Sequence, residues 1–291
     1  MTSLPTDSSV PSGGRGRARP PVFRALGSAH PPAWIEIASR RYDCREILKH
    51  DSWACTVLYE GPAGRVACKL NRQQPIFGLP MKWCGRWLAR RERRMLQRLV
   101  DVPEIPEDAG DVTVDGVPLP HAAAHEFLEG HPLAQGERVG DGFFPRMVEM
   151  LKVIHARDIA IVDLNKRENI IVGLDGRPHL IDFQISFILP DGWPGLRLPM
   201  RALLRVLQRA DVYHLYKHFA KLRPDQLGPE QTQRLTRRPW AIRAWRCISG
   251  PFQFFRRRLL ILIGVRKGKG LAITECDPED AVRREQARRI P

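Results

Sequence analysis

The segment IVDLNKRENIIVGLDGRPHLIDFQIS, residues 161–186, constrains the fold more than any other part of the sequence. Its two apolar halves, NIIV and HLID, flank a GLDGRP turn, and the Asp-Gly pair in that turn is typical of a β-hairpin. Asp163, Asn169 and Asp182 lie at the ends of strands that otherwise read as fully buried. Because a buried carboxylate is costly without a partner, the pattern predicts a ligand that needs these groups, such as a metal-bound phosphate.

The composition is that of a globular protein with an anionic partner. With 43% hydrophobic residues among 291, the chain can bury one large core or two moderate lobes. Its net charge of +15 predicts contact with nucleotide, lipid headgroups or nucleic acid. The six cysteines show no zinc-type spacing, so we expect reduced thiols in a cytoplasmic protein. Neither a secretory signal nor a membrane-spanning run is expected.

The N-terminal half predicts a basic leader, a small sheet and a helix. Residues 1–33 are rich in Pro, Ser, Gly and Arg and read as a flexible leader. From Tyr42, the runs CREILKH, WACTVLYEG and GRVACKL predict three antiparallel strands. Residues 79–100 predict a helix with apolar residues at helical spacing. Glu92 falls on that apolar stripe, where an acid needs a cationic partner.

Lys69 is the candidate partner of Glu92. Alternation along GRVACKL puts Val66, Cys68 and Leu70 on one face of the strand and Lys69 on the other, with Ala67. A Lys69–Glu92 ion pair across the helix–sheet interface is therefore predicted. In the alternative interpretation, both residues are solvated surface charges.

The C-terminal half predicts a second, mainly helical part. A strand that runs into a turn is expected at 124–133, and helices are expected at 143–159 and 201–222. Asp211, on the last helix, is a candidate to anchor the 161–169 loop. His214 and His218 lie four residues apart, but a solvated helix face is favoured over a metal site because no Glu lies between them.

The order of these parts resembles the protein kinase fold over about residues 42–220. The elements are V-A-C-K, a helix glutamate, a linker strand, a helix that ends in I-H, D-L-N-K-R-E-N and D-F-Q. The chain is similar to the bacterial lipopolysaccharide core (Kdo and heptose) kinases and more distantly to the RIO kinases. The resemblance implies a two-lobed α+β fold, with a sheet and one helix in the N-lobe (34–126), a reduced helical C-lobe (127–235) and a basic aromatic extension (236–291).

The resemblance also implies a function and residue roles. It implies ATP- and magnesium-dependent transfer of the γ-phosphate to a hydroxyl of a sugar, a lipopolysaccharide or a protein serine or threonine. Asp163 would accept the proton of the hydroxyl, and Lys166 would reach the γ-phosphate. Magnesium would bind Asn169 and Asp182, with Asp163 nearby and facing open solvent. The nucleotide-binding residues would be Lys69, Glu92, Ala67, Glu126 and Leu128.

Several departures from the kinase pattern affect the expected activity. Ile161-Val162 replaces the H-R of H-R-D, so control by activation-loop phosphorylation is not expected. Asn169 follows Asp163 by six residues where the kinase spacing is five. Gln184 replaces the D-F-G glycine, and KHDSW (49–53) stands where a glycine-rich loop would cover the phosphates. The alternative is therefore a pseudokinase-type scaffold that binds nucleotide or lipid with little or no catalysis.

The segment 237–269 predicts a surface interaction. It contains ten Arg or Lys, five aromatic residues and no acid. This composition suits an anionic membrane, with peripheral binding at its inner face, and nucleic acid is the less favoured partner. The basic leader and the arginine-rich stretch 86–98 are the other membrane-binding candidates. An ordinary pair of helices with snorkelling arginines is the structural alternative.

Overall fold

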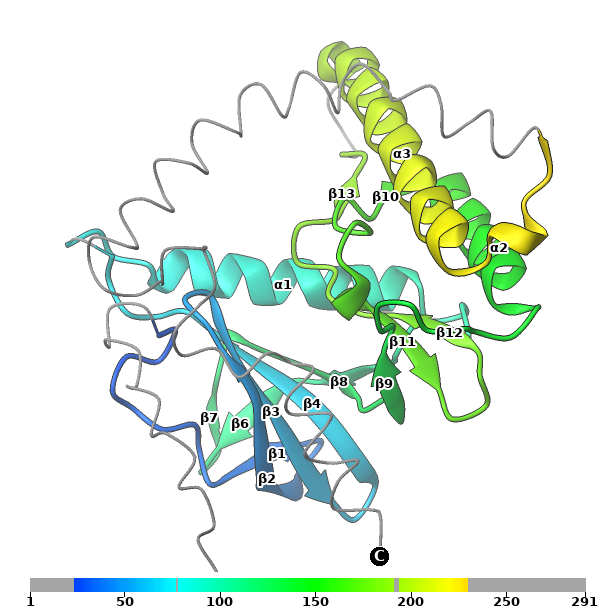
Figure 1. Cartoon of the computed structure of the whole chain (residues 1–291). Coiled ribbons are helices and arrows are strands. Elements are labelled where there is room, and N and C mark those ends of the chain that lie inside the picture. Colours follow the sequence, from blue (N-terminus) through cyan, green and yellow to red (C-terminus); the bar gives the residue numbers. More distant parts are fainter. Residues whose placement is uncertain (1–23, 77, 191–193, 230–291) are drawn as a thin grey trace, which may run out of the picture.

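A computed structural model describes residues 24–76, 78–190 and 194–229, which form an α+β fold (Figure 1). Its largest element is an eight-stranded antiparallel sheet with the order β5-β8-β4-β3-β2-β1-β6-β7. The sheet curls, because β6 also approaches β8 although four strands separate them in this order. The strands are β1 (Trp34–Ile37), β2 (Arg40–His50), β3 (Ala54–Gly61), β4 (Gly64–Asn71), β5 (Asp108–Gly110), β6 (Val112–Val114), β7 (Val117–Pro118) and β8 (Ala122–Glu126).

The alternation of β4 separates the two faces of the sheet as the sequence predicts. Val66, Cys68 and Leu70 are buried in the apolar cluster inside the curl. Lys69 lies on the opposite face, which α1 (Lys82–Arg98) covers. The sheet therefore has one apolar face that forms a core and one face that can present a charged group to the helix.

The packed part of the chain begins earlier than residue 34. Ala25 is fully buried, and its backbone N–H donates to the Asp51 carbonyl at 2.8 Å. The Tyr59 hydroxyl donates to the Pro32 carbonyl at 2.9 Å. Residues 24–33 therefore contact the sheet rather than belonging to a flexible leader. The sheet also opens with four strands instead of three, because β1 precedes β2.

Helix α1 packs closely against the sheet because its inner face is apolar and contains a glycine. Leu88, Met95 and Leu96 are buried at the spacing that the sequence predicts. A Cβ on Gly85 would lie 2.3 Å from the Arg72 carbonyl oxygen, so only glycine permits this approach of α1 to the end of β4. Figure 1 shows α1 (cyan) lying along the sheet toward β11 and β12.

The second part of the chain combines two helices with two small sheets. The predicted hairpin is confirmed, because Ile170 pairs with Leu180 and Val172 with Pro178. The expected strand at 124–133 divides between two sheets, since β8 ends at Glu126 and β9 joins β11. The further elements are β9 (Gly130–Pro132), α2 (Phe143–Ala156), β10 (Ile159–Ala160), η2 (Arg167–Asn169), β11 (Ile170–Gly173), β12 (Pro178–Leu180), β13 (Phe187–Ile188), α3 (Pro194–Leu222) and η3 (Pro224–Gln226).

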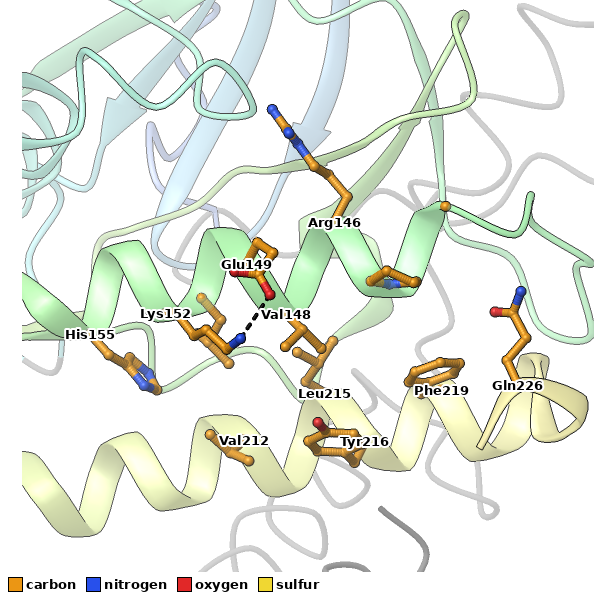
Figure 2. Close-up of a pocket in the computed structure, with 13 residues that line it drawn as sticks. Arg146, Val148, Glu149, Lys152, His155, Val212, Leu215, Tyr216, Phe219 and Gln226 are labelled. Atoms are coloured by element: carbon orange, nitrogen blue, oxygen red, sulfur yellow. Dashed lines mark hydrogen bonds and ion pairs between the residues drawn. The ribbon is translucent and has the colours of Figure 1, made fainter. Parts of the chain in front are cut away.

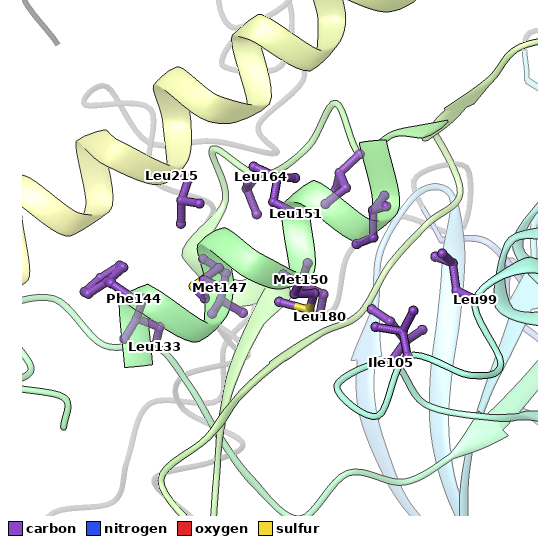
Figure 3. Packing of buried hydrophobic residues seen from close by; sticks show 14 of the residues in the cluster. Leu99, Ile105, Leu133, Phe144, Met147, Met150, Leu151, Leu164, Leu180 and Leu215 are labelled. Carbon is purple, nitrogen blue, oxygen red and sulfur yellow. The ribbon is translucent and has the colours of Figure 1, made fainter. Parts of the chain in front are cut away.

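One apolar cluster joins the two parts (Figure 3). Leu99, just after α1, shares it with Met147 and Leu151 of α2, Leu180 of the hairpin and Leu215 of α3. The C-terminal end of α1 is thereby fixed against the helical part, which keeps the hairpin near the sheet.

None of the helices in the described ranges is long and apolar enough to cross a membrane. The segment 237–269 and most of the leader lie outside those ranges.

Candidate functional site

Lys69 and Glu92 form the predicted ion pair. The Lys69 ammonium lies 2.6 Å from Glu92 Oε1, and both side chains are buried. β4 provides the lysine, and the inner face of α1 provides the glutamate where an apolar residue would otherwise stand. The prediction is confirmed, and the interpretation of both residues as solvated charges is wrong.

Asp182 shares the same ammonium. Its Oδ1 atom lies 3.1 Å from Lys69 Nζ, so one cation faces two carboxylates. Burial alone would lower the pKa of Lys69, but Asp182 and Glu92 outweigh burial and raise it. Burial raises the pKa of Asp182, yet Lys69, Lys166 and Lys49 outweigh it and lower the pKa. Lysine and aspartate are therefore both ionised at neutral pH, whereas burial raises the pKa of Glu92 despite the neighbouring Lys69.

Asp163 is paired rather than free. The Lys166 ammonium forms an ion pair with Asp163 Oδ2, and the Asp163 side chain is only 16% exposed. The expectation that Asp163 faces open solvent is therefore wrong, because Lys166 covers it. The expectation that Lys166 points toward the site is consistent with this contact.

Asn169 and Asp182 come from adjacent backbone segments. The Ile181 N–H donates to the Asn169 carbonyl at 3.0 Å, which places the start of β11 beside the residue before Asp182. The buried Asn169 amide donates to the Asp163 carbonyl at 3.4 Å. The hairpin thus gathers the three polar residues of the opening segment in one region.

The donors present suit a shared metal rather than an independent metal centre. The described part of the chain contains no group of three or more His, Cys, Asp or Glu side chains that could hold a metal ion. Asn169 and Asp182 offer hard oxygen ligands, and magnesium accepts such ligands together with waters and phosphate oxygens. Waters and phosphate oxygens would therefore complete the shell of a magnesium ion here.

Asp211 holds the loop that carries Asp163, as predicted. This fully buried aspartate of α3 accepts hydrogen bonds from the backbone N–H groups of Ile161, at 2.7 Å, and Val162, at 2.9 Å. His155 Nε2 lies 3.2 Å from the same carboxylate. Val162 has a φ of 70°, which is costly for a β-branched residue, and the Asp211 hydrogen bond keeps it there.

His218 also supports this loop, which the sequence did not predict. It is buried, and its Nε2 atom donates to the Leu164 carbonyl at 3.0 Å. The expected solvated helix face is therefore wrong for His218. His214 is half-buried on the same helix, and burial lowers the pKa of its imidazole to about 4. The four-residue spacing of His214 and His218 does not indicate which backbone carbonyl either side chain would contact.

Gln184 bonds to the sheet from the glycine position of the kinase pattern. Its amide donates to the Asn71 Oδ1 atom at 2.8 Å, and the fully buried Asn71 donates in turn to the His121 carbonyl at 3.0 Å. Burial raises the pKa of Glu92, and a hydrogen bond from the Gln184 side chain opposes part of that shift. The Gln184–Asn71 hydrogen bond therefore ties the segment after Asp182 to β4.

The turn at 49–53 provides a cation where a glycine-rich loop would stand. The Asp51 carboxylate accepts from the backbone N–H groups of Trp53, at 2.8 Å, and Ala54, at 3.0 Å, which closes the turn. Lys49 lies 3.0 Å from Asp51, and its charge reaches Asp182. The sequence alone did not identify Lys49 as a cation whose charge acts on Asp182.

The remaining predicted nucleotide-binding residues line the connection between the two parts. Ala67 is buried on the Lys69 face of β4 and pairs with His125 of β8. Glu126, at the end of β8, is exposed, and Leu128 is half-buried in the segment between β8 and β9. His125, also missed from the sequence, is buried near Lys69, and burial lowers its pKa to about 4.

A groove of about 870 Å³ lies elsewhere, between α2 and α3 (Figure 2). Val148, Leu215 and Phe219 give it apolar walls, and Glu149 and Lys152 lie at its edge. None of the five residues Lys69, Glu92, Asp163, Asn169 and Asp182 lines it. The groove is therefore distinct from the candidate site.

No protein-family model matches the sequence, and no curated protein matches it significantly. The functional argument therefore depends on the geometry of the site.

Proposed function

We propose that the protein is an ATP- and magnesium-dependent phosphotransferase with a two-lobed protein kinase-like fold. Its reaction is transfer of the γ-phosphate to a hydroxyl of a sugar, a lipopolysaccharide or a protein serine or threonine. The observation that carries this proposal is the contact of one buried lysine with carboxylates from two distant segments, Glu92 of α1 and Asp182 after the hairpin. A kinase needs this arrangement, because the lysine must be held in place to meet the phosphates.

Each residue has a role that its surroundings support. Lys69 binds the α- and β-phosphates, and Glu92 keeps its ammonium in position. Lys49, at the turn above Asp182, adds a second cation for the phosphates. Asp163 takes the proton of the acceptor hydroxyl once Lys166 leaves it for the γ-phosphate. The cation thus moves from one anion to another, and Asp163 becomes free to act as the base.

Asn169 and Asp182 would hold magnesium, which would neutralise the phosphate charge when bound. The lowered pKa of Asp182 supports this assignment, since an ionised carboxylate is a hard oxygen ligand that magnesium accepts. ATP binding would therefore be magnesium-dependent.

Two substitutions distinguish the proposed phosphotransferase from the alternative, a pseudokinase-type scaffold. In the full chain, Asp163→Asn should reduce magnesium-dependent phosphate transfer or ATP hydrolysis by at least about a hundredfold and leave ATP affinity intact, because only the general base is lost. Asp182→Asn should weaken binding of magnesium-ATP. Asp175→Asn, at the exposed hairpin turn, is the control with the same loss of charge.

Wild-type protein that binds magnesium-ATP but has no turnover with any acceptor would establish the scaffold instead. If the Asp163→Asn variant keeps its turnover, Asp163 is not the general base.

A further inference from the structure

The outer face of α1 presents tryptophan and arginine along one line. Trp83 is 66% exposed and Trp87 is 50% exposed, one turn apart. Arg90 and Arg94 follow at the i+7 and i+11 positions from Trp83, so all four residues lie on the same side of the helix. Leu79, 67% exposed, precedes the helix by one turn.

Within the described part of the chain, no acid neutralises the positive charge on this face. Glu92 is the only acid of α1, and it is buried against Lys69. Arg93, at the side of the helix, pairs with Asp108 and Asp111. Among the described residues, no acid forms an ion pair with the exposed cations Lys82, Arg86, Arg90 and Arg94.

We propose that this outer face of α1 binds an anionic membrane surface. Exposed tryptophans are suited to the headgroup level, and neighbouring cations are suited to lipid phosphates. The helix would lie parallel to the membrane, since its opposite face is already packed on the sheet. The inference is independent of the proposed phosphotransfer.

The environment of Trp87 favours lipid over nucleic acid. The Arg91 guanidinium lies 4.9 Å from the Trp87 ring centroid and covers one face of the ring. Arg91 is held there because it also donates to the Ser186 carbonyl. A base-stacking site needs accessible ring faces. A ring that presents its edge and a single face is better suited to the membrane interface.

The test uses the full chain and vesicles of phosphatidylcholine with and without phosphatidylglycerol, in flotation at about 0.1 M salt. Arg90→Gln with Arg94→Gln should weaken binding to the anionic vesicles about thirtyfold, because each cation near such a surface contributes about 1 kcal/mol. Arg90→Lys with Arg94→Lys keeps the charge and should bind as the wild type does. Arg40→Gln with Arg177→Gln removes two exposed cations from other elements and is the matched control.

Trp83→Ala tests the apolar contribution separately. It should weaken binding to the anionic vesicles, and the loss should persist when salt is raised, because salt screens only the charges. Thermal unfolding of each variant establishes that it folds.

The proposal is overturned if Arg90→Gln with Arg94→Gln binds anionic vesicles as tightly as the control pair does. It is also overturned if that variant loses affinity for a single-stranded oligonucleotide but keeps its affinity for vesicles. If Trp83→Ala binds the anionic vesicles as tightly as the wild type does, the tryptophans do not insert into the membrane surface.

Discussion

Substitution of Asp211 should destabilise the fold and release the loop that carries Asp163. Its carboxylate is fully buried and accepts from the backbone N–H groups of Ile161 and Val162 at 2.7 and 2.9 Å. Asp211→Ala leaves both donors without this acceptor. The acceptor comes from α3, 49 residues away in sequence from Val162.

The magnitude follows from two opposing contributions. Each buried N–H group left without an acceptor costs about 1–3 kcal/mol, so two cost about 2–6 kcal/mol. Release of Val162 from its φ of 70° relieves about 1–3 kcal/mol of backbone strain, which offsets part of that cost. The midpoints of these ranges, about 4 and about 2 kcal/mol, leave an expected loss of about 2 kcal/mol. For a folded part of about 200 residues, that loss lowers the melting temperature by about 4–8 °C.

The assay is urea and thermal unfolding followed by far-UV circular dichroism. Asp211→Asn keeps one acceptor oxygen, so its effect should lie between wild type and Asp211→Ala. Asp175→Asn, at the exposed hairpin turn, keeps the acceptor for the Arg177 N–H, so it is the control and should change stability by no more than about 0.5 kcal/mol. Hydrogen exchange at the amides of 161 and 162 should accelerate in Asp211→Ala. If Asp211→Ala is as stable as the Asp175 control, the anchoring role is refuted.

Two further predictions concern packing and pH. Gly85→Ala should lower the melting temperature although alanine favours helix, because its Cβ would lie 2.3 Å from the Arg72 carbonyl oxygen; an unchanged melting temperature would contradict this close approach. Stability should fall as pH drops from about 6.5 to about 4, because burial lowers the pKa values of His121, His125 and His214 to about 4. The unfolded chain then binds more protons than the native one, and a urea midpoint independent of pH in this window would contradict the prediction.

Periodicity predicted the parts of the site that depend on a local pattern. The period of two in β4 placed Lys69 opposite Val66 and Cys68, and the helical period of α1 placed Glu92 on the buried face. Each side chain needed a partner of opposite charge, so their pairing followed from burial. The hairpin at 170–180 was predictable for a similar reason, since its Asp-Gly turn fixes which residues pair.

The supporting contacts have no such local pattern. Asn71 and Gln184 are 113 residues apart, and neither lies on an apolar stripe that would mark it as buried. His218 illustrates the same difficulty, because its helical spacing fits a solvated face as well as a buried one. What decides such cases is a backbone N–H or carbonyl that the loop leaves without a partner, and only the folded loop reveals it. Lys69 and Glu92 of the candidate site could thus be predicted because each buried charge needs a partner. The residues that hold the neighbouring loop could not be predicted, because the groups that they satisfy belong to the backbone, which is the same at every position of the sequence.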